Sequence, residues 1–524
     1  MADQVVVFIH GWSVTHTKTY GHLPVRLRDE AKQQGRNLVI KDIYLSEYIS
    51  FEDSVRMEDI SRGLEAAVKR QGLDKTRFAA ITHSTGGPVA RDWWNRFYLE
   101  NGRGDKCPMS HLIMLAPANF GSALAILGKQ RVGRLRSWYY GVEPGTRVLD
   151  WLELGSADSW ALNAKWIESD GSQIGPKGVF PFVVTGEWID RKLYDHLNPY
   201  TGELGSDGTV RACAANLNSH HIVLEQEPLR DVPEMSDEAA SLFDMLDRRR
   251  SSSKSVWVAP QLAWKSQTVS PEIPFAVVKQ KSHVGTVMGV MESVKADVGH
   301  AADAETVDTI LKCLLVRTRR QFDGLCSEFR EQTERAQKDL EERIEKEERL
   351  FIFERVFIHD RHSMVIFRVW DEAGGEVTDF DLVLTATHPD RPDDDPDPNF
   401  LPPGLIVDRQ MNSKHRNTLS LYFNYQALVG LDELPPGDGS VRRSHAGIDQ
   451  LGLVIRPRPV EGAVHHLPCE LRASGEVLQA VLQPNQTTLV DIVLRRVVRE
   501  GVFRVRKGTK ARSFKDDSRG EPLR

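Results

Sequence analysis

The sequence predicts an α/β protein with a doubly wound, mostly parallel sheet, followed by a long helix and an all-β, sandwich-like C-terminal domain. Three observations predict this. Short apolar runs alternate with helix-periodic stretches up to residue 316, an amphipathic stretch covers 317–350, and short β segments follow it. A chain of 524 residues is also too long for one ordinary core, so we expect more than one domain.

The expected strands of the parallel sheet are short and apolar. Residues 4–9, Gln-Val-Val-Val-Phe-Ile, are typical of a strand that is buried on both faces. Similar runs follow at 38–44, 77–82, 111–116, 180–186 and 274–278. Two insertions interrupt the alternation in the expected domain 1–316. We expect the first, at about 119–170, to be lid-like and the second, at 224–270, to be a surface excursion.

The remainder of the chain has a different pattern. Residues 317–350 place Phe322, Leu325 and Phe329 at helical spacing among charges, which predicts a helical connector. Residues 351–505 read as a β-sandwich domain. Its expected strands are 351–358, 363–370, 379–386, 418–425, 451–456, 487–496 and 501–505. Residues 506–524 carry seven basic and three acidic residues and few apolar ones, which predicts a disordered basic tail.

Composition excludes several classes of function. A net charge of -6 on this length is too dilute to indicate a nucleic-acid partner. The five cysteines lack CxxC spacing and indicate neither a disulfide framework nor a zinc site, so we expect synthesis in the cytoplasm. The N-terminal residues show no signal-peptide pattern, and no run of about 18 apolar residues occurs. We therefore expect that any export uses a route without a cleavable leader.

A strand, a turn of small residues and a helix pattern surround Ser84. Residues 78–87 read Phe-Ala-Ala-Ile-Thr-His-Ser-Thr-Gly-Gly. This resembles the nucleophile elbow of α/β-hydrolases, Gly-x-Ser-x-Gly, with Thr82 in place of the first glycine. The resemblance implies an α/β-hydrolase fold in which Ser84 is the nucleophile.

Two backbone N–H groups are expected to bind the oxyanion of such an enzyme. His10-Gly11-Trp12 directly follows the first strand, where lipase-like members of the fold carry a His-Gly pair. The resemblance assigns one donor to Trp12 and the second to Thr85, the residue after the nucleophile. A simple turn at His10-Gly11 is the alternative.

The acid is expected between the nucleophile and the histidine, because the order in this fold is Ser, acid, His. Residues 205–210, Gly-Ser-Asp-Gly-Thr-Val, follow an expected strand and resemble the acid loop of many lipases. This implies that Asp207 is the acid. Asp190 and Asp195 are rivals without that local context.

The expected base follows the last apolar run. Residues 275–278 lead into a loop in which Ser282-His283-Val284-Gly285 resembles the Ser-His-x-Gly loops of bacterial lipases. This implies that His283 accepts the proton of Ser84. His220 and His221 are alternatives, but too little chain separates them from Asp207 to form another strand.

Further stretches favour a lipase. Residues 115–122, Leu-Ala-Pro-Ala-Asn-Phe-Gly-Ser, resemble the Pro-His-x-Gly-Ser turn of lipases, with Asn119 in place of histidine. Residues 152–163 are similar to elements after the lid of lecithin-cholesterol acyltransferase-like and GPI inositol-deacylase-like enzymes. The resemblance covers about 1–315. It implies a serine-dependent lipase or phospholipase that cleaves an acyl ester of a glycerolipid through an acyl-enzyme, with no cofactor and no metal.

The sequence leaves partners and alternatives open. Aromatic and basic residues interleave in 124–151, as in a lid that contacts a membrane surface, although core packing explains them nearly as well. The Asp/Pro loop at 389–403 could bind calcium or stay solvated. We expect the C-terminal domain to bind a protein partner or to target the enzyme.

Three readings of the whole chain follow. In the first, the chain is a lipase with an appended domain, an architecture that is similar to that of lipase effectors delivered by type VI secretion. One alternative is an esterase or acyltransferase that acts on a soluble ester. The other is a catalytically silent hydrolase fold that acts through binding by its C-terminal domain.

Overall fold

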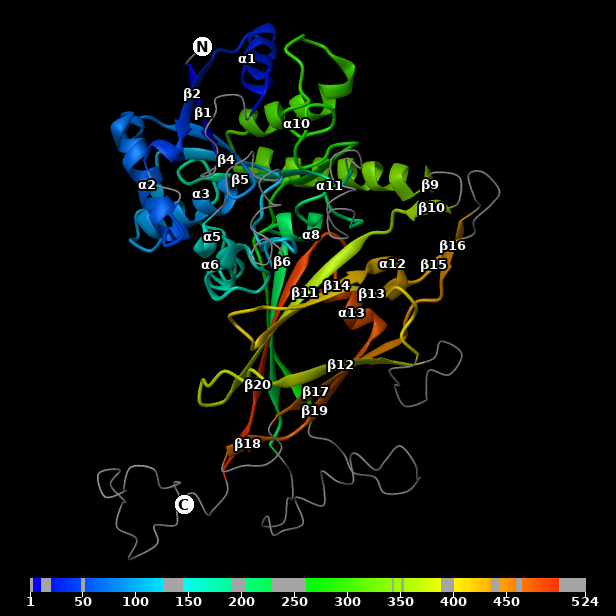
Figure 1. The fold of residues 1–524 in the computed structure, drawn as a ribbon. Helices are drawn as coiled ribbons and strands as arrows, with labels where there is room; N and C mark the ends of the chain where they lie inside the picture. Colours follow the sequence, from blue (N-terminus) through cyan, green and yellow to red (C-terminus); the bar gives the residue numbers. More distant parts are fainter. Residues whose placement is uncertain are drawn as a thin grey trace, which may run out of the picture.

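An α/β layer and a β-rich layer lie against each other in the molecule, with the α/β layer uppermost in Figure 1. The computed structural model describes residues 3–10, 20–48, 52–126, 145–189, 203–228, 261–341, 344–349, 353–387, 400–434, 443–458 and 464–498. The expected strand at 501–505 and the expected basic tail lie outside these ranges.

The first sheet is the parallel sheet that the apolar runs predict. Within the described residues its order is β2-β1-β3-β4-β5-β8, and every neighbouring pair is parallel. The strands are β1 (Gln4–His10), β2 (Leu38–Tyr44), β3 (Phe78–His83), β4 (Met109–Leu115), β5 (Phe180–Gly186) and β8 (Phe275–Val278). All residues of β3 and β5 are buried, which explains why both strands are mostly apolar. The predicted α/β-hydrolase fold is confirmed.

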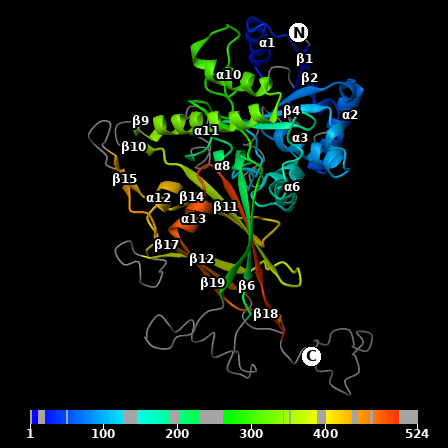
Figure 2. The ribbon, with the colours of Figure 1, turned by 180° about the vertical axis from the view of Figure 1, so that it is seen from behind.

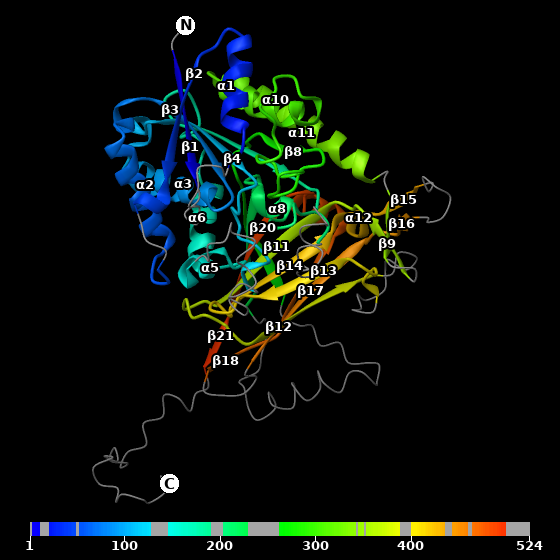
Figure 3. The ribbon, with the colours of Figure 1, turned by 45° about the horizontal axis from the view of Figure 1, so that its top comes forward.

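Helices cover both faces of this sheet (Figure 3). On one side lie α2 (Met57–Arg70) and α3 (Gly86–Trp94), which contact each other. On the other lie α1 (Leu23–Gln33), α10 (Ala301–Leu315) and α11 (Arg319–Glu341). The other α-helices of this layer are α5 (Thr146–Leu152), α6 (Ala157–Ile167) and α8 (Ala212–Ala215). Among the described helices, none has both the length and the apolar character needed to cross a bilayer.

The second sheet draws strands from both halves of the chain, and its order is β13-β14-β11-β20-β6-β7. Its strands are β6 (Ser219–Gln226), β7 (Leu262–Val269), β11 (His362–Asp371), β13 (Ile406–Met411), β14 (Thr418–Asn424) and β20 (Thr487–Leu494). β20 lies between β11 and β6 and is parallel to both. The stretch 224–270, expected to be a surface excursion, thus contains β7 and the end of β6. The expected boundary at 316 does not separate the two sheets, because β6 satisfies its backbone groups by pairing with β20.

A third sheet completes a sandwich with the second one. It consists of β12 (Phe380–Ala386), β17 (Gln450–Pro457) and β19 (Cys469–Ser474). One apolar core joins the two sheets, with Phe367 and Leu421 from one and Leu384 and Ile455 from the other. The predicted β-rich second domain is therefore confirmed. The smaller elements around it are β15 (Leu431–Leu434), β16 (Arg443–His445), β18 (Val464–His466), β21 (Arg496–Val498), α12 (Tyr425–Val429) and α13 (Gly475–Val481).

Neither face of the second sheet is exposed along residues 362–367 of β11. Met364 and Ile366 of this strand belong to the core of the α/β layer, whereas Val365 and Phe367 belong to the core of the sandwich. Because side chains alternate between the faces of a strand, β11 contributes to both interiors. The approach is close at Gly155, where a Cβ atom would lie 2.3 Å from Cγ2 of Thr418. The two layers therefore pack as one body, as Figure 2 also shows from behind.

The predicted connector helix is shorter than expected. α11 ends at Glu341, and β9 (Ile344–Arg349) then pairs antiparallel with β10 (Phe353–Ile358). The charged sequence Ile-Glu-Lys-Glu-Glu-Arg of β9 continues the helical pattern of α11. Cross-strand pairing with β10 overrides that local preference.

Two glycines test the packing around the last strands of the parallel sheet. A Cβ atom at Gly186 would lie 1.7 Å from the carbonyl oxygen of Lys281, whereas a Cβ atom at Gly324 in α11 meets nothing within 4 Å. We expect Gly186→Ala to cost about 3 kcal/mol or more of stability. Gly324→Ala, the matched control, should gain about 0.5–1 kcal/mol because alanine favours a helix. Unfolding followed by calorimetry measures both, and equal effects would contradict this packing.

A buried histidine on β4 predicts a loss of stability in acid. Burial lowers the pKa of His111 from 6.5 to about 4, although its Nε2 lies 2.8 Å from the carbonyl oxygen of Val316. The unfolded chain takes up a proton near pH 6.5 and the folded chain only near pH 4. Lowering the pH from 7 to 5 should therefore cost about 2 kcal/mol at this site. In His111→Gln this part of the pH dependence should vanish. Urea unfolding at both pH values is the measurement, and an unchanged difference in the variant would refute the assignment.

Candidate active site

Ser84 lies in the sharp turn between β3 and α3. Its φ angle of 53° is in the left-handed region, which residues other than glycine rarely adopt and which costs about 1–3 kcal/mol. The turn is held by a 3.0 Å hydrogen bond from the Ser84 N–H to the carbonyl of Leu115 on β4. The turn is also closely packed, because a Cβ atom at Gly87 would lie 2.7 Å from Cβ of Pro117. The result is a half-buried serine at the carboxyl end of the sheet.

Thr82, which replaces the usual glycine of the elbow, fits because the helix side of the turn is small. Its side chain is fully buried. A Cβ atom at Gly86 would lie 3.4 Å from Cβ of Thr82, so the two positions share one small space. The glycine at 86 therefore allows the threonine at 82.

His283 lies between Ser84 and Asp207. Its Nε2 is 3.0 Å from Oγ of Ser84, and its Nδ1 is 2.8 Å from Oδ2 of Asp207. His283 is 3% exposed and Asp207 is fully buried. When Nδ1 carries the proton and donates to the carboxylate, Nε2 is free to accept from the serine hydroxyl. The structure thus brings together the three side chains that the sequence predicts for nucleophile, base and acid.

The loop at 205–210 aims both oxygens of Asp207. Oδ2 accepts from His283, while Oδ1 accepts from the N–H groups of Thr209 and Val210 at 3.0 and 2.8 Å. The N–H of His283 also donates to the carbonyl of Asp207 at 2.8 Å. Backbone and side-chain bonds together therefore fix the carboxylate against the imidazole.

His83 is a neighbour of the site that sequence reasoning missed. Its Nε2 lies 3.1 Å from the carbonyl oxygen of His283, and the two rings are 4.7 Å apart. Burial, and secondarily the nearby His283, lowers the pKa of His83 well below 6.5. The ring is therefore neutral at neutral pH, and its Nε2–H donates to the backbone of the base. The signal in the sequence was its place beside Ser84 in the elbow.

One expected oxyanion donor lies at the start of α3. Thr85 is half-buried, and the part of the chain that the structure describes records no acceptor for its N–H. The aligned peptide dipoles of a helix N-terminus favour negative charge there. Trp12, the other expected donor, lies outside the described residues.

The rival acids and bases are elsewhere or outside the description. His221 lies on β6, with its Nε2 2.9 Å from Oδ2 of Asp491 on β20. His220, next to it, lies 3.2 Å from the side-chain amide of Gln267. Asp190 and Asp195 fall in 190–202, which the structure does not describe. Neither described histidine contacts the Ser84 group.

The lid and the calcium loop are described only in part. Leu124 and Trp151, at the two ends of the expected membrane-facing stretch, are buried. Residues 127–144 between them and residues 388–399 of the acidic loop lie outside the described ranges. In the described ranges, no group of three or more His, Cys, Asp or Glu side chains could hold a metal ion.

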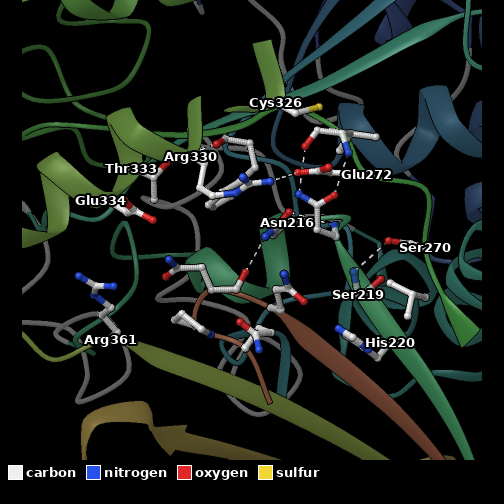
Figure 4. Close-up of a pocket in the computed structure, with 18 of the residues that line it drawn as sticks. Asn216, Ser219, His220, Ser270, Glu272, Cys326, Arg330, Thr333, Glu334 and Arg361 are labelled. Atoms are coloured by element: carbon white, nitrogen blue, oxygen red, sulfur yellow. Dashed lines mark hydrogen bonds and ion pairs between the residues drawn. The ribbon is translucent and has the colours of Figure 1, made fainter. Parts of the chain in front are cut away.

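A cavity of about 400 Å³ lies away from the Ser84 group, between α11, β6 and the segment before β20 (Figure 4). Its polar lining is largely bonded within itself. Arg330 pairs with Glu272, and the amide of Asn216 donates to the carbonyl of Asn485 at 2.8 Å. The bond between Asn216, after α8, and Asn485, before β20, ties the β-rich layer to the α/β layer.

Comparisons with protein-family models and with curated proteins find no match. Solved structures do match. Phospholipase PlaB from Legionella pneumophila is 35% identical, with a TM-score of 0.77 over 100% of both chains. A second structure of that enzyme, in complex with thio-NAD, is 35% identical with a TM-score of 0.76 over 97% of both chains.

This chain belongs to the PlaB family. The likeness to PlaB spans both layers, whereas the motifs in the sequence indicated a lipase-like hydrolase only for about 1–315. The β-rich layer is therefore part of the PlaB fold and not an addition to a self-contained hydrolase.

Proposed function

We propose that this member of the PlaB family is a serine-dependent lipase or phospholipase that hydrolyses an acyl ester of a glycerolipid. The observation that carries the proposal is the line of hydrogen bonds from Ser84 through His283 to Asp207, at 3.0 and 2.8 Å. Its 35% identity with a protein named as a phospholipase supports the substrate class. A binding protein would need neither the strained serine nor the buried His–Asp pair behind it.

The proposed reaction runs through an acyl-enzyme. Oγ of Ser84 attacks the ester carbonyl while Nε2 of His283 takes its proton, and Asp207 stabilises the imidazolium that forms. The N–H of Thr85 binds the developing oxyanion, with the N–H of Trp12 as the proposed second donor. One such donor typically contributes about 3 kcal/mol to the transition state.

The second half of the reaction restores the serine. His283 gives its proton to the leaving alcohol, which departs as a lysophospholipid or a partial glyceride. The same imidazole then deprotonates a water molecule, which attacks the acyl carbonyl. The fatty acid leaves, and the proton returns from His283 to Oγ of Ser84.

Hydrolysis of defined substrates tests the proposal. Purified protein is incubated with phosphatidylcholine and phosphatidylglycerol vesicles, a triglyceride emulsion and p-nitrophenyl acetate, and the products are identified by mass. We expect a fatty acid and a lysophospholipid from at least one type of vesicle. Turnover of p-nitrophenyl acetate without lipid turnover would favour the soluble-ester alternative. No turnover of any substrate would contradict an enzymatic role.

A further inference from the structure

The loop that carries Asp207 is closed by its own ends. Arg211 is 2% exposed, and its Nη2 and Nε lie 2.7 and 2.8 Å from the two carboxylate oxygens of Glu203. Backbone bonds run in parallel with this pair, since the N–H of Ala212 donates to the carbonyl of Gly205 at 2.9 Å. The two-pronged geometry of such a guanidinium–carboxylate pair fixes the orientation of both partners. In the sequence, Asp207 lies midway between Glu203 and Arg211.

Two residues of the second sheet also contact Arg211. Nη2 of Arg211 also pairs with Oδ2 of Asp408, which lies on β13, 197 residues further along the chain. The guanidinium carbon lies 4.1 Å above the ring of Tyr422 on β14. The hydroxyl of Tyr422 donates to the carbonyl of Leu204 at 2.8 Å. Two strands of the second sheet therefore hold both ends of the acid loop.

The fit between loop and sheet leaves no spare space. Gly205 has a φ angle of +73°, and a Cβ atom there would lie 2.3 Å from the hydroxyl oxygen of Tyr422 and 2.6 Å from Nδ1 of His362. The rings of His362 and Tyr422 are stacked with their centres 4.8 Å apart. A shift of this sheet would therefore move the backbone two residues before Asp207.

The charged side chains that join the acid loop to the second sheet are largely buried. A buried guanidinium costs several kcal/mol unless it is paired, and Arg211 is paired with two carboxylates, Glu203 in the acid loop and Asp408 on β13. Burial raises the pKa of Glu203, and Arg211 opposes that rise. The carboxylate of Asp408 also raises the pKa of Glu203, so both carboxylates depend on the guanidinium that lies between them.

We propose that Arg211, held by Glu203 and Asp408 over the ring of Tyr422, is a positioning residue that sets Asp207 against His283. The β-rich layer thereby completes the active-site geometry. The inference rests on the proposed function, because it assigns a role in activating Ser84. A displacement of about 1 Å in a catalytic group can cost about a hundredfold in rate.

The rate at which an alkyl fluorophosphonate labels Ser84 is the readout, because it needs an activated serine but no lipid. The main variants are Asp408→Asn and Tyr422→Phe, which leave Arg211 and Glu203 in place. We expect labelling to fall about tenfold to a hundredfold in Asp408→Asn and about tenfold in Tyr422→Phe. Asp408→Glu should recover part of the loss. Circular dichroism is used to check that each variant is folded before its labelling rate is measured.

Two comparisons separate positioning from general destabilisation. Arg368→Gln breaks another ion pair of the second sheet, in which Nε of Arg368 lies 2.7 Å from Oδ1 of Asp491. Arg368 is six residues from His362, about 20 Å along β11. This variant should melt earlier and label within twofold of wild type. The second comparison adds Asp408→Asn to the variant Asp207→Asn, whose slow residual labelling is followed for hours. In this background, Asp408→Asn should not lower the labelling rate further.

Several outcomes would overturn the inference. The first is a labelling rate in both main variants that equals that of wild type. The second is that Asp408→Asn lowers the labelling rate by the same factor whether residue 207 is Asp or Asn. The third is that wild type is not labelled at Ser84. If wild type is labelled but releases no fatty acid from any lipid, the proposed lipase function fails. The positioning role is then still decided by the labelling rates.

Discussion

Replacement of Ser84 by alanine is expected to lower kcat for ester hydrolysis by about 10⁴ to 10⁶, because the nucleophile of an acyl-enzyme pathway is lost. The hydroxyl is 3.0 Å from Nε2 of His283 and makes the first covalent bond in the proposed reaction. The strained turn stays compatible with alanine, so folding should be retained. The measurement is fatty-acid release from vesicles at matched protein concentrations.

Ser110→Ala is the matched control for this experiment. Ser110 is also half-buried and its hydroxyl donates to the carbonyl of Phe78 at 2.9 Å, but it lies at the start of β4, away from the elbow. We expect this variant to retain wild-type turnover within about twofold. Turnover by Ser84→Ala close to that of wild type would exclude Ser84 as the nucleophile.

Asp207→Asn should have the second largest effect, a fall in kcat of about 10⁴ with little change in KM. An asparagine keeps the size of the side chain, but its amide can turn a donor toward Nδ1 of His283. The imidazole then presents the wrong tautomer to Ser84, and the imidazolium of the transition state loses its counter-charge. Steady-state kinetics on a soluble ester measure kcat and KM separately.

The chain offers a second buried Asp–His pair as control. Oδ2 of Asp491 lies 2.9 Å from Nε2 of His221, which resembles the 2.8 Å contact of Asp207 with His283, but no described serine completes it. Asp491→Asn should therefore lower thermal stability and leave kcat within a few-fold of wild type. If both variants lost activity equally, Asp207 would have no special part in the reaction.

The parallel sheet and the Ser84 group could be predicted because their signals are local. A strand that is buried on both faces reads as an apolar run, and Ser84 and His283 follow such runs within a few residues, whereas the motif around Asp207 lies further beyond its strand. Parallel strands bring the ends of these runs to one edge of the sheet. Three short motifs, far apart in the sequence, therefore predicted one cluster in space.

The second sheet could not be predicted from local pattern. β6, with the polar residues Ser219 and His220 at its start, is stabilised by β20, whose residues lie more than 260 positions away. β13 is an edge strand with an irregular mixture of exposed and buried residues, so it shows no alternation. Asp408 on that strand gave no sign that it contacts the acid loop.

The most direct test of the account is a peptide map of the protein after reaction with a long-chain alkyl fluorophosphonate, with fatty-acid release from vesicles measured on the same samples. The account predicts one phosphonyl group per chain, on Ser84, and a loss of fatty-acid release in proportion to the label. Full release from protein that is quantitatively labelled at Ser84, or loss of release with the label on another residue, would contradict it.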